Sequence, residues 1–205
     1  MSMAFRAIVS AAALFALAGC ASGPGIPDTN YFRLPEPAAV ERMQQPLFEV
    51  PVVVGTLQAD GVHSGQAVLY ATDPDGRRLR AYHYQLWADP PVRMLQRRLI
   101  SLLRRSGVAP LVVDRLPPED SVRISGRIEA FERVPGVEGW DVVVAIALRA
   151  DRGDRTRPLH VRMYRARHSV RGDRLVDSTD AFGAAVDEIF ARFLDDVAKA
   201  VASGR

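Results

Sequence analysis

The chain has 205 residues, of which 48% are hydrophobic and 25% charged, with a formal net charge of +3. This composition is ordinary for a globular protein, and the chain is long enough for one sizeable core. Its 27 basic and 24 acidic residues nearly balance, which gives no reason to expect nucleic acid as a partner. The single cysteine, Cys20, excludes disulfides within the chain, so stability must come from packing.

Residues 1–19 have the pattern of a bacterial secretion signal. Arg6 supplies a positive start, and the apolar run from Ala7 to Ala18 is shorter than the roughly 20 residues that a bilayer-spanning helix needs. The tetrad Leu17-Ala18-Gly19-Cys20 resembles the lipobox of bacterial lipoproteins. In a lipobox the cysteine thiol receives a diacylglycerol, cleavage falls before the cysteine, and the new amine is acylated, as with palmitate. We therefore predict that Cys20 is the lipid attachment site; a free thiol beside a plain cleavage site is the alternative.

The residues after the cysteine are predicted to form a flexible tether. Residues 20–30 are rich in Gly, Pro and Ser, and at about 3 Å per residue they reach some 30 Å at most. No aspartate follows Cys20 directly. By resemblance to Gram-negative lipoproteins, this favours the periplasmic face of the outer membrane over the inner membrane. Residues 31–205 are predicted to form one domain.

The first half of that domain is predicted to be mostly strand. Residues 31–35 form a short edge strand that ends at a proline, and a valine-rich strand follows around residues 50–54. A hairpin then turns at Asp73-Pro74-Asp75-Gly76, because proline followed by glycine suits a tight turn.

A helix is predicted after the hairpin. Asp89 is expected to cap its start, and Gly107 is expected to end it in a left-handed backbone conformation. Its apolar stripe at spacings of three and four residues consists of Val92, Leu95, Leu99, Leu102 and Leu103.

Three strands and a long helix are predicted for the second half. The strands cover about residues 121–131, 141–150 and 158–168. In the third strand, Leu159, Val161 and Met163 are expected to face the core and His160, Arg162 and Tyr164 to face outward. Ser178 or Thr179 is expected to cap the last helix. Its buried stripe is Phe182, Val186, Ile189, Phe193, Val197 and Val201.

Antiparallel strands in runs, separated by two helices, predict an α+β fold. We expect a two-layer domain, with a mostly antiparallel sheet and both amphipathic helices packed on one face. The other face is expected to be more polar, with arginines, Ser125, His160 and Tyr164.

The sequence carries no recognised catalytic, cofactor or metal motif. It lacks a Gly-x-Ser-x-Gly elbow, a His-Glu-x-x-His pair and a glycine-rich phosphate loop. Its histidines, His63, His83, His160 and His168, have no metal-binding spacing. Asp195 and Asp196 are expected to be a solvated surface pair. We therefore expect a protein without enzymatic activity, cofactor or metal.

Two groups of residues are candidates for contact with a partner or a membrane. Arg93, Arg97 and Arg104 belong to an arginine-rich helix face. This face either is simply solvated or contacts anionic lipid headgroups or an acidic partner. Tyr82, Tyr84 and Trp87 precede that helix; they are either core residues or part of an interface.

The order of these features resembles the ABC-type transport auxiliary lipoproteins, the family of the paraquat-inducible protein C lipoprotein. The resemblance covers about residues 30–200. It lies in "YFRLP" after the tether, Trp87-Ala88-Asp89-Pro90 leading into a helix, Phe131-Glu132 in a strand, and the terminal amphipathic helix. The segment from Gly55 to Tyr84 departs from the family pattern, and it is expected near the partner surface.

The resemblance implies a non-enzymatic accessory of an envelope transport system. In such systems an inner-membrane ABC transporter works with periplasmic MCE-domain (mammalian cell entry) proteins to move lipids or other hydrophobic molecules. The expected partners are thus an MCE-domain protein, through it the transporter, and the membrane. The second hypothesis is a lipid-binding carrier with a pocket between sheet and helices. A homo-oligomer is compatible with either.

The lipid anchor is directly testable. We expect Cys20→Ser to move the protein from the envelope pellet to the soluble fraction, because without acyl chains nothing retains a water-soluble domain on a bilayer. Cell fractionation followed by a carbonate wash measures this. An unchanged, carbonate-resistant pellet would contradict the assignment of Cys20.

Overall fold

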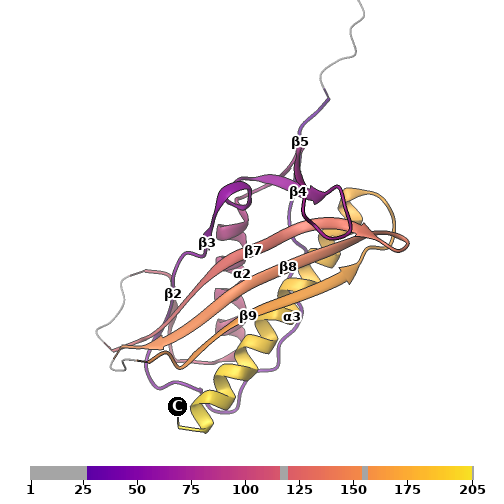
Figure 1. The fold of residues 1–205 in the computed structure, drawn as a ribbon. Helices are drawn as coiled ribbons and strands as arrows, with labels where there is room; N and C mark the ends of the chain where they lie inside the picture. Colours follow the sequence, from indigo (N-terminus) through magenta and orange to yellow (C-terminus); the bar gives the residue numbers. More distant parts are fainter. Residues whose placement is uncertain (1–26, 116–119, 154–156, 205) are drawn as a thin grey trace, which may run out of the picture.

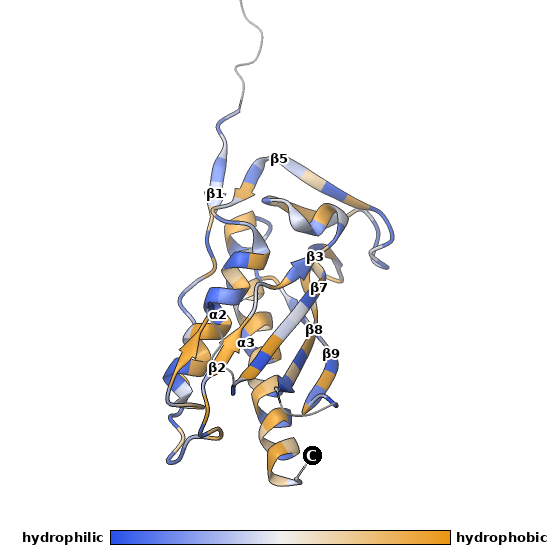
Figure 2. Cartoon of the chain, turned by 90° about the vertical axis from the view of Figure 1, so that its left-hand side faces the viewer, coloured by the Kyte–Doolittle hydropathy of each residue, from blue (hydrophilic) through white to orange (hydrophobic). Residues whose placement is uncertain are grey.

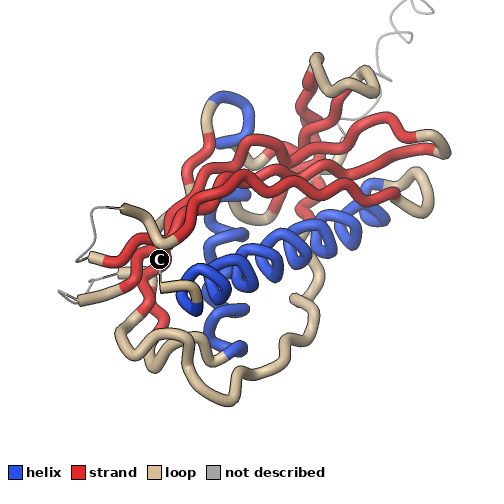
Figure 3. The backbone as a smooth tube through the Cα atoms, turned by 60° about the horizontal axis from the view of Figure 1, so that its bottom comes forward, coloured by secondary structure: helices blue, strands red, loops and turns tan. Residues whose placement is uncertain are grey.

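The computed structural model describes residues 27–115, 120–153 and 157–204. Its strands form a nine-stranded, curled sheet, and its two long helices lie on the same side of that sheet (Figures 1 and 3). In chain order the elements are β1 (Asn30–Phe32), β2 (Val52–Val54), β3 (Gln58–Ala59), the short 3-10 helix η2 (Gly61–Ser64), β4 (Ala67–Ala71), β5 (Leu79–Trp87), α2 (Pro91–Ser106), β6 (Val112–Val113), β7 (Val122–Gly136), β8 (Gly139–Arg152), β9 (His160–Ser169) and α3 (Leu175–Ala202). The α+β prediction is confirmed.

Strand β7 is the spine of the sheet. Along one edge it pairs antiparallel with β8, which pairs antiparallel with β9. Along its other edge it pairs in parallel with β2, β3 and β4 in succession. The longest strands are antiparallel, as expected, and the short strands joined to β7 in parallel make the sheet mixed. Because β7 has 15 residues, one strand can organise nearly the whole sheet.

The predicted hairpin is confirmed as β4 and β5. Gly76 has φ +71°, a left-handed conformation, and its N–H donates to the Asp73 carbonyl across the turn at 3.1 Å. The Asp73 carboxylate accepts hydrogen bonds from the N–H groups of Arg77 at 2.9 Å and Arg78 at 3.0 Å. The first of these bonds is the main reason that the pKa of Asp73 lies below its ordinary value.

The core lies between the concave face of the sheet and the two helices. Hydrophobic residues concentrate where α2, α3 and β2 face one another (Figure 2). The predicted stripe of α3 is buried from Phe182 to Val197, and Phe190 and Leu194 are buried beside it. Five central residues of β8, Val142 to Ile146, are also buried, so the sheet is covered on both faces there.

Leu159, just before β9, is buried as predicted, but within β9 the predicted alternation of inward and outward side chains was wrong by one residue. Val161 and Met163 are exposed on the outer face of the sheet, while Tyr164 is completely buried against α3. The Tyr164 hydroxyl donates a hydrogen bond to the carboxylate of Asp196 on α3, and this bond allows the large ring to face inward. His160 faces α3 as well, so neither residue belongs to the polar outer face, whereas Ser125 is exposed.

The helix ends partly differ from the expected ones. Gly107 has φ +67° and ends α2, as predicted. Asp89 does not cap that helix; it forms an ion pair with Arg97 instead. Helix α3 begins at Leu175, one turn before the predicted caps, so Ser178 and Thr179 lie inside it.

A buried ion pair joins the two helices. Arg98 on α2 is only 7% exposed, and its guanidinium donates to both carboxylate oxygens of Asp187 on α3 at 2.7 and 2.8 Å. A third donor of Arg98 reaches the Pro35 carbonyl at 2.6 Å, and Asp187 accepts from the Ala38 N–H at 2.9 Å. The pair therefore fixes the segment after β1 onto both helices.

Among the described residues, the helices include none with the length and hydropathy needed to cross a membrane.

Removal of the Arg98–Asp187 ion pair tests whether it stabilises the fold. We expect Arg98→Met to lower the free energy of unfolding by about 3 kcal/mol, because Asp187 and the Pro35 carbonyl lose their partner. Arg93→Met, at an exposed position of the same helix, should change it by less than about 0.5 kcal/mol. Urea denaturation measures both values, and equal losses in the two variants would contradict the assigned role.

Candidate functional site

The predicted attachment residue, Cys20, lies outside the described residues, but the structure places the start of the domain. Strand β1 pairs in parallel with the end of β5, with Asn30 opposite Gln85 and Phe32 opposite Trp87. The chain that precedes β1 thus reaches the fold beside β5. Any anchor at Cys20 would hold this end of the domain, which includes the β4–β5 hairpin, near the membrane (Figure 1).

Two of the predicted contact residues lie beside an open groove on β5. Tyr84 is exposed, whereas Tyr82 is half-buried and packs on Tyr70 with the ring centroids 4.5 Å apart. Both line a groove of about 620 Å³ that also includes Arg80 and His83. The structure therefore brings these tyrosines together on one surface of the hairpin.

Trp87, the third predicted contact residue of β5, lies in the core. It is 1% exposed, and its ring packs against Phe131 of β7 and Phe182 of α3 with centroids 5.3 and 5.1 Å away. Phe131 and Phe182 are themselves 4.5 Å apart. Direct contact with a partner does not fit this position, because the strand ends with its side chain turned into the domain.

The three predicted arginines of α2 differ in what they can do. Arg93 is exposed, and Arg97 is exposed but held by Asp89. Arg104 donates through Nε and Nη2 to the Val112 carbonyl at 2.9 and 2.8 Å, so it anchors the strand that follows the helix. Arg97 also lines a pocket of about 440 Å³ between α2 and residues 33–37.

Sequence reasoning missed a buried cation next to the tyrosine groove. Arg133 of β7 is buried, donates to the Tyr82 hydroxyl at 3.2 Å and the Asp173 carbonyl at 3.1 Å, and stacks on Trp140 at 4.3 Å. Burial lowers the pKa of Arg133, because it penalises the charged form. The sequence gives no distinct signal for this position, because Arg133 lies in a strand that also carries exposed arginines such as Arg123.

The Glu132 of the family motif is buried as well. Its carboxylate accepts from the Phe131 N–H at 2.6 Å, and the ring of His63 in η2 lies 3.1 Å from the same oxygen. Glu132 thus connects η2 to the spine strand, which gives it a structural role.

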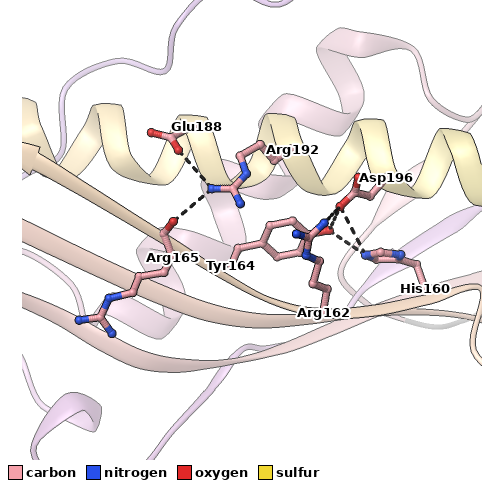
Figure 4. Close-up of polar contacts among 7 residues, drawn as sticks. All are labelled: His160, Arg162, Tyr164, Arg165, Glu188, Arg192 and Asp196. Carbon is pink, nitrogen blue, oxygen red and sulfur yellow. Dashed lines mark hydrogen bonds and ion pairs between the residues drawn. The ribbon is translucent and has the colours of Figure 1, made fainter.

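A polar cluster connects β9 to α3 (Figure 4). The Tyr164 hydroxyl donates to Asp196 at 2.8 Å and lies 2.7 Å from His160 Nε2, and Arg162 reaches Asp196 at 3.0 Å. Burial raises the pKa of Tyr164 and lowers that of His160, whereas the hydrogen bond from Tyr164 lowers the pKa of Asp196. Asp196 is therefore not the free surface carboxylate that was expected. Each group in the cluster is used to hold the strand to the helix.

In the part of the chain that the structure describes, no three metal-ligating side chains come together in a group that could hold an ion.

The order and packing of these elements have known relatives. A sequence model of the family described as ABC-type transport auxiliary lipoprotein component matches residues 32–198. The chain belongs to this family. Its fold is similar to that of protein XCC0632 from Xanthomonas campestris, with a TM-score of 0.71 at 13% identity over 83% of this chain and 96% of that one.

Two other solved structures share the fold. An uncharacterized protein has a TM-score of 0.67 at 14% identity, over 83% of this chain and 99% of that one. The hypothetical protein CT253 from Chlamydia trachomatis has a TM-score of 0.53 at 9% identity, over 76% and 99% of the two chains. At these identities the likeness concerns the fold alone. No curated protein matches the chain.

Family membership makes this protein an auxiliary lipoprotein of ABC-type transport, held in the envelope at a membrane. The motif residues that carried the resemblance, Trp87 and Phe131, meet in the core, and Glu132 holds η2. They therefore identify the fold, and the contact surface must be formed by other residues.

The β9–α3 cluster predicts a pH-dependent stability. Because the folded state lowers the pKa of His160 below 6.5, the unfolded chain binds the extra proton first, and stability must fall as the pH drops below about 6.5. His160→Gln should cost about 1 kcal/mol at pH 7, and this difference from the wild type should shrink at pH 5. Urea unfolding at both pH values measures the difference in free energy of unfolding between the two proteins. A difference that is the same at pH 7 and pH 5 would contradict a lowered pKa of His160.

Proposed function

We propose that this lipoprotein is a non-enzymatic docking component that links an ABC transporter–MCE system to the outer membrane. In this role it faces the periplasm and helps to move lipids or other hydrophobic molecules across the envelope. The observation that carries the proposal is the family match over residues 32–198, preceded by the lipobox at Cys20. The fold is consistent with the role, because its polar clusters connect elements to one another.

The position of the chain start supports docking near a membrane. The predicted tether of residues 20–30 reaches about 30 Å at most, and its last residue, Asn30, already lies in β1, so the hairpin and the start of α2 stay close to the anchored surface. Tyr84 and Arg93 are exposed at this end, and they offer an aromatic and a cationic contact for a periplasmic partner. Aromatic residues and arginine are the types most enriched at protein interfaces.

The carrier hypothesis has less support from the packing. It needs a lipid-sized space between the sheet and the helices, and in the described residues Trp87, Phe131 and Phe182 fill that layer. Native mass spectrometry of the protein released from membranes separates the two hypotheses: bound lipid favours a carrier, and an empty protein favours docking.

The docking role predicts a specific partner. After mild crosslinking and detergent extraction, the wild-type lipoprotein should co-purify with an MCE-domain protein. Tyr84→Ser combined with Arg93→Glu should reduce that recovery about tenfold, since loss of an aromatic anchor and a charge reversal together cost more than about 1.4 kcal/mol. Arg171→Glu, at another exposed arginine, is the matched control and should leave recovery unchanged. Failure to recover any MCE-domain protein with the wild type would contradict the proposal.

A further inference from the structure

Strand β9 forms one edge of the sheet. It has ten residues, His160–Ser169, and among the described residues it pairs with β8 alone. Helix α3 lies against one face of β9, as Figures 1 and 3 show, and leaves the outer side of the strand open. A long edge strand offers unpaired N–H and C=O groups to any other extended chain, and soluble proteins usually shorten or cover such edges.

The ladder pattern shows which backbone groups face that edge. The Val170 N–H donates to the Trp140 carbonyl directly opposite, so the bonds between β9 and β8 fall on even-numbered residues of β9. The odd-numbered residues, from Val161 onward, therefore direct their N–H and C=O groups to the open edge. The Arg165 carbonyl confirms this phase, because it accepts a hydrogen bond from Arg192 of α3 at 3.1 Å (Figure 4).

The same odd-numbered residues present apolar side chains on the outer face. Val161 is 60% exposed and Met163 is 49% exposed, and they are neighbours on one face of the strand. Val161 also lines a groove of about 260 Å³, together with Ser125 of β7 and Ala147 of β8.

The charge of the strand determines what can pair with it. Its sequence, HVRMYRARHS, contains three arginines and two histidines but no acidic residue. On the outer face, Arg167 pairs with Asp141 of β8, whereas the guanidinium of Arg165 has no partner among the described residues. If β9 of a second copy paired with this edge, like charges would lie opposite one another, which is destabilising. An acidic segment would instead gain cross-strand ion pairs.

We propose that the open edge of β9, from Val161 to Arg165, binds an extended acidic segment of another protein as an added strand. The backbone of Val161 and Met163 supplies the ladder hydrogen bonds, their side chains supply apolar contact, and Arg165 selects for a carboxylate. Arg192 already occupies the Arg165 carbonyl, so the added strand ends there. The inference does not depend on the identity of the transport partner.

A photo-crosslinking amino acid at Val161 of the full lipoprotein, expressed in its own cells, tests this proposal. The expected adduct joins position 161 to an acidic, extended segment of a different protein, and mass spectrometry of the crosslinked peptide identifies it. The same amino acid at Val176, which is exposed near the start of α3, should not give this adduct. An adduct to a second copy of the chain, or no adduct, would overturn the proposal.

Two variants then separate edge pairing from mere proximity. Met163→Pro removes an N–H that faces the edge and leaves the ladder to β8 intact, so it should abolish the adduct. Arg165→Glu should lower the yield about fivefold through like-charge contact, whereas Arg123→Glu, at an exposed arginine of β7, should not. Because Arg165→Glu changes only an exposed side chain, it decides the question if the proline variant folds poorly. Equal yields in Arg165→Glu and Arg123→Glu would refute selection for an acidic strand.

Discussion

The contact among Trp87, Phe131 and Phe182 holds the domain together. Trp87 ends the β4–β5 hairpin, Phe131 lies in the middle of the spine strand, and Phe182 belongs to the long final helix. With ring centroids between 4.5 and 5.3 Å apart, the three rings join segments that are far apart in sequence. Aromatic clusters of this kind bury large areas and prefer tilted or edge-on contacts, as here. The hairpin surface can face a partner because this cluster fixes its base.

The Arg98–Asp187 pair has a second role besides joining the helices. It holds Pro35 and Ala38, which lie in the segment after β1, and β1 is the strand that the predicted tether would lead into. An anchor at Cys20, as proposed, would transmit a pull on the domain to this segment. A bidentate, buried ion pair with backbone partners on both sides resists such a pull better than apolar packing of an irregular segment, since its hydrogen bonds are directional.

Much of the fold could be predicted from local patterns, and the misses share one physical cause. The stripes of α2 and α3, the Asp-Pro-Asp-Gly turn and the end of α2 at Gly107 depend on neighbours in sequence. Nothing local distinguishes buried Arg98 from exposed Arg97 beside it, because the partner of Arg98, Asp187, lies 89 residues away in sequence. Trp87 precedes a helix in sequence, but only the packing of β5 on β7 and α3 decides that it points inward.

The phase of β9 is the most informative of these misses. A rule that places valine and methionine in the core fails there because Tyr164 reaches Asp196 from the inner face, with His160 and Arg162 beside it. The same choice turns Val161 and Met163 outward, where they are 60% and 49% exposed and add less to the core than buried residues would. Apolar residues that are exposed at a cost to solubility, on a strand with one unpaired edge, are better explained by a segment of another protein than by the fold itself. The polar cluster thus has two effects: it fixes β9 on α3, and it presents the opposite side of the strand for recognition.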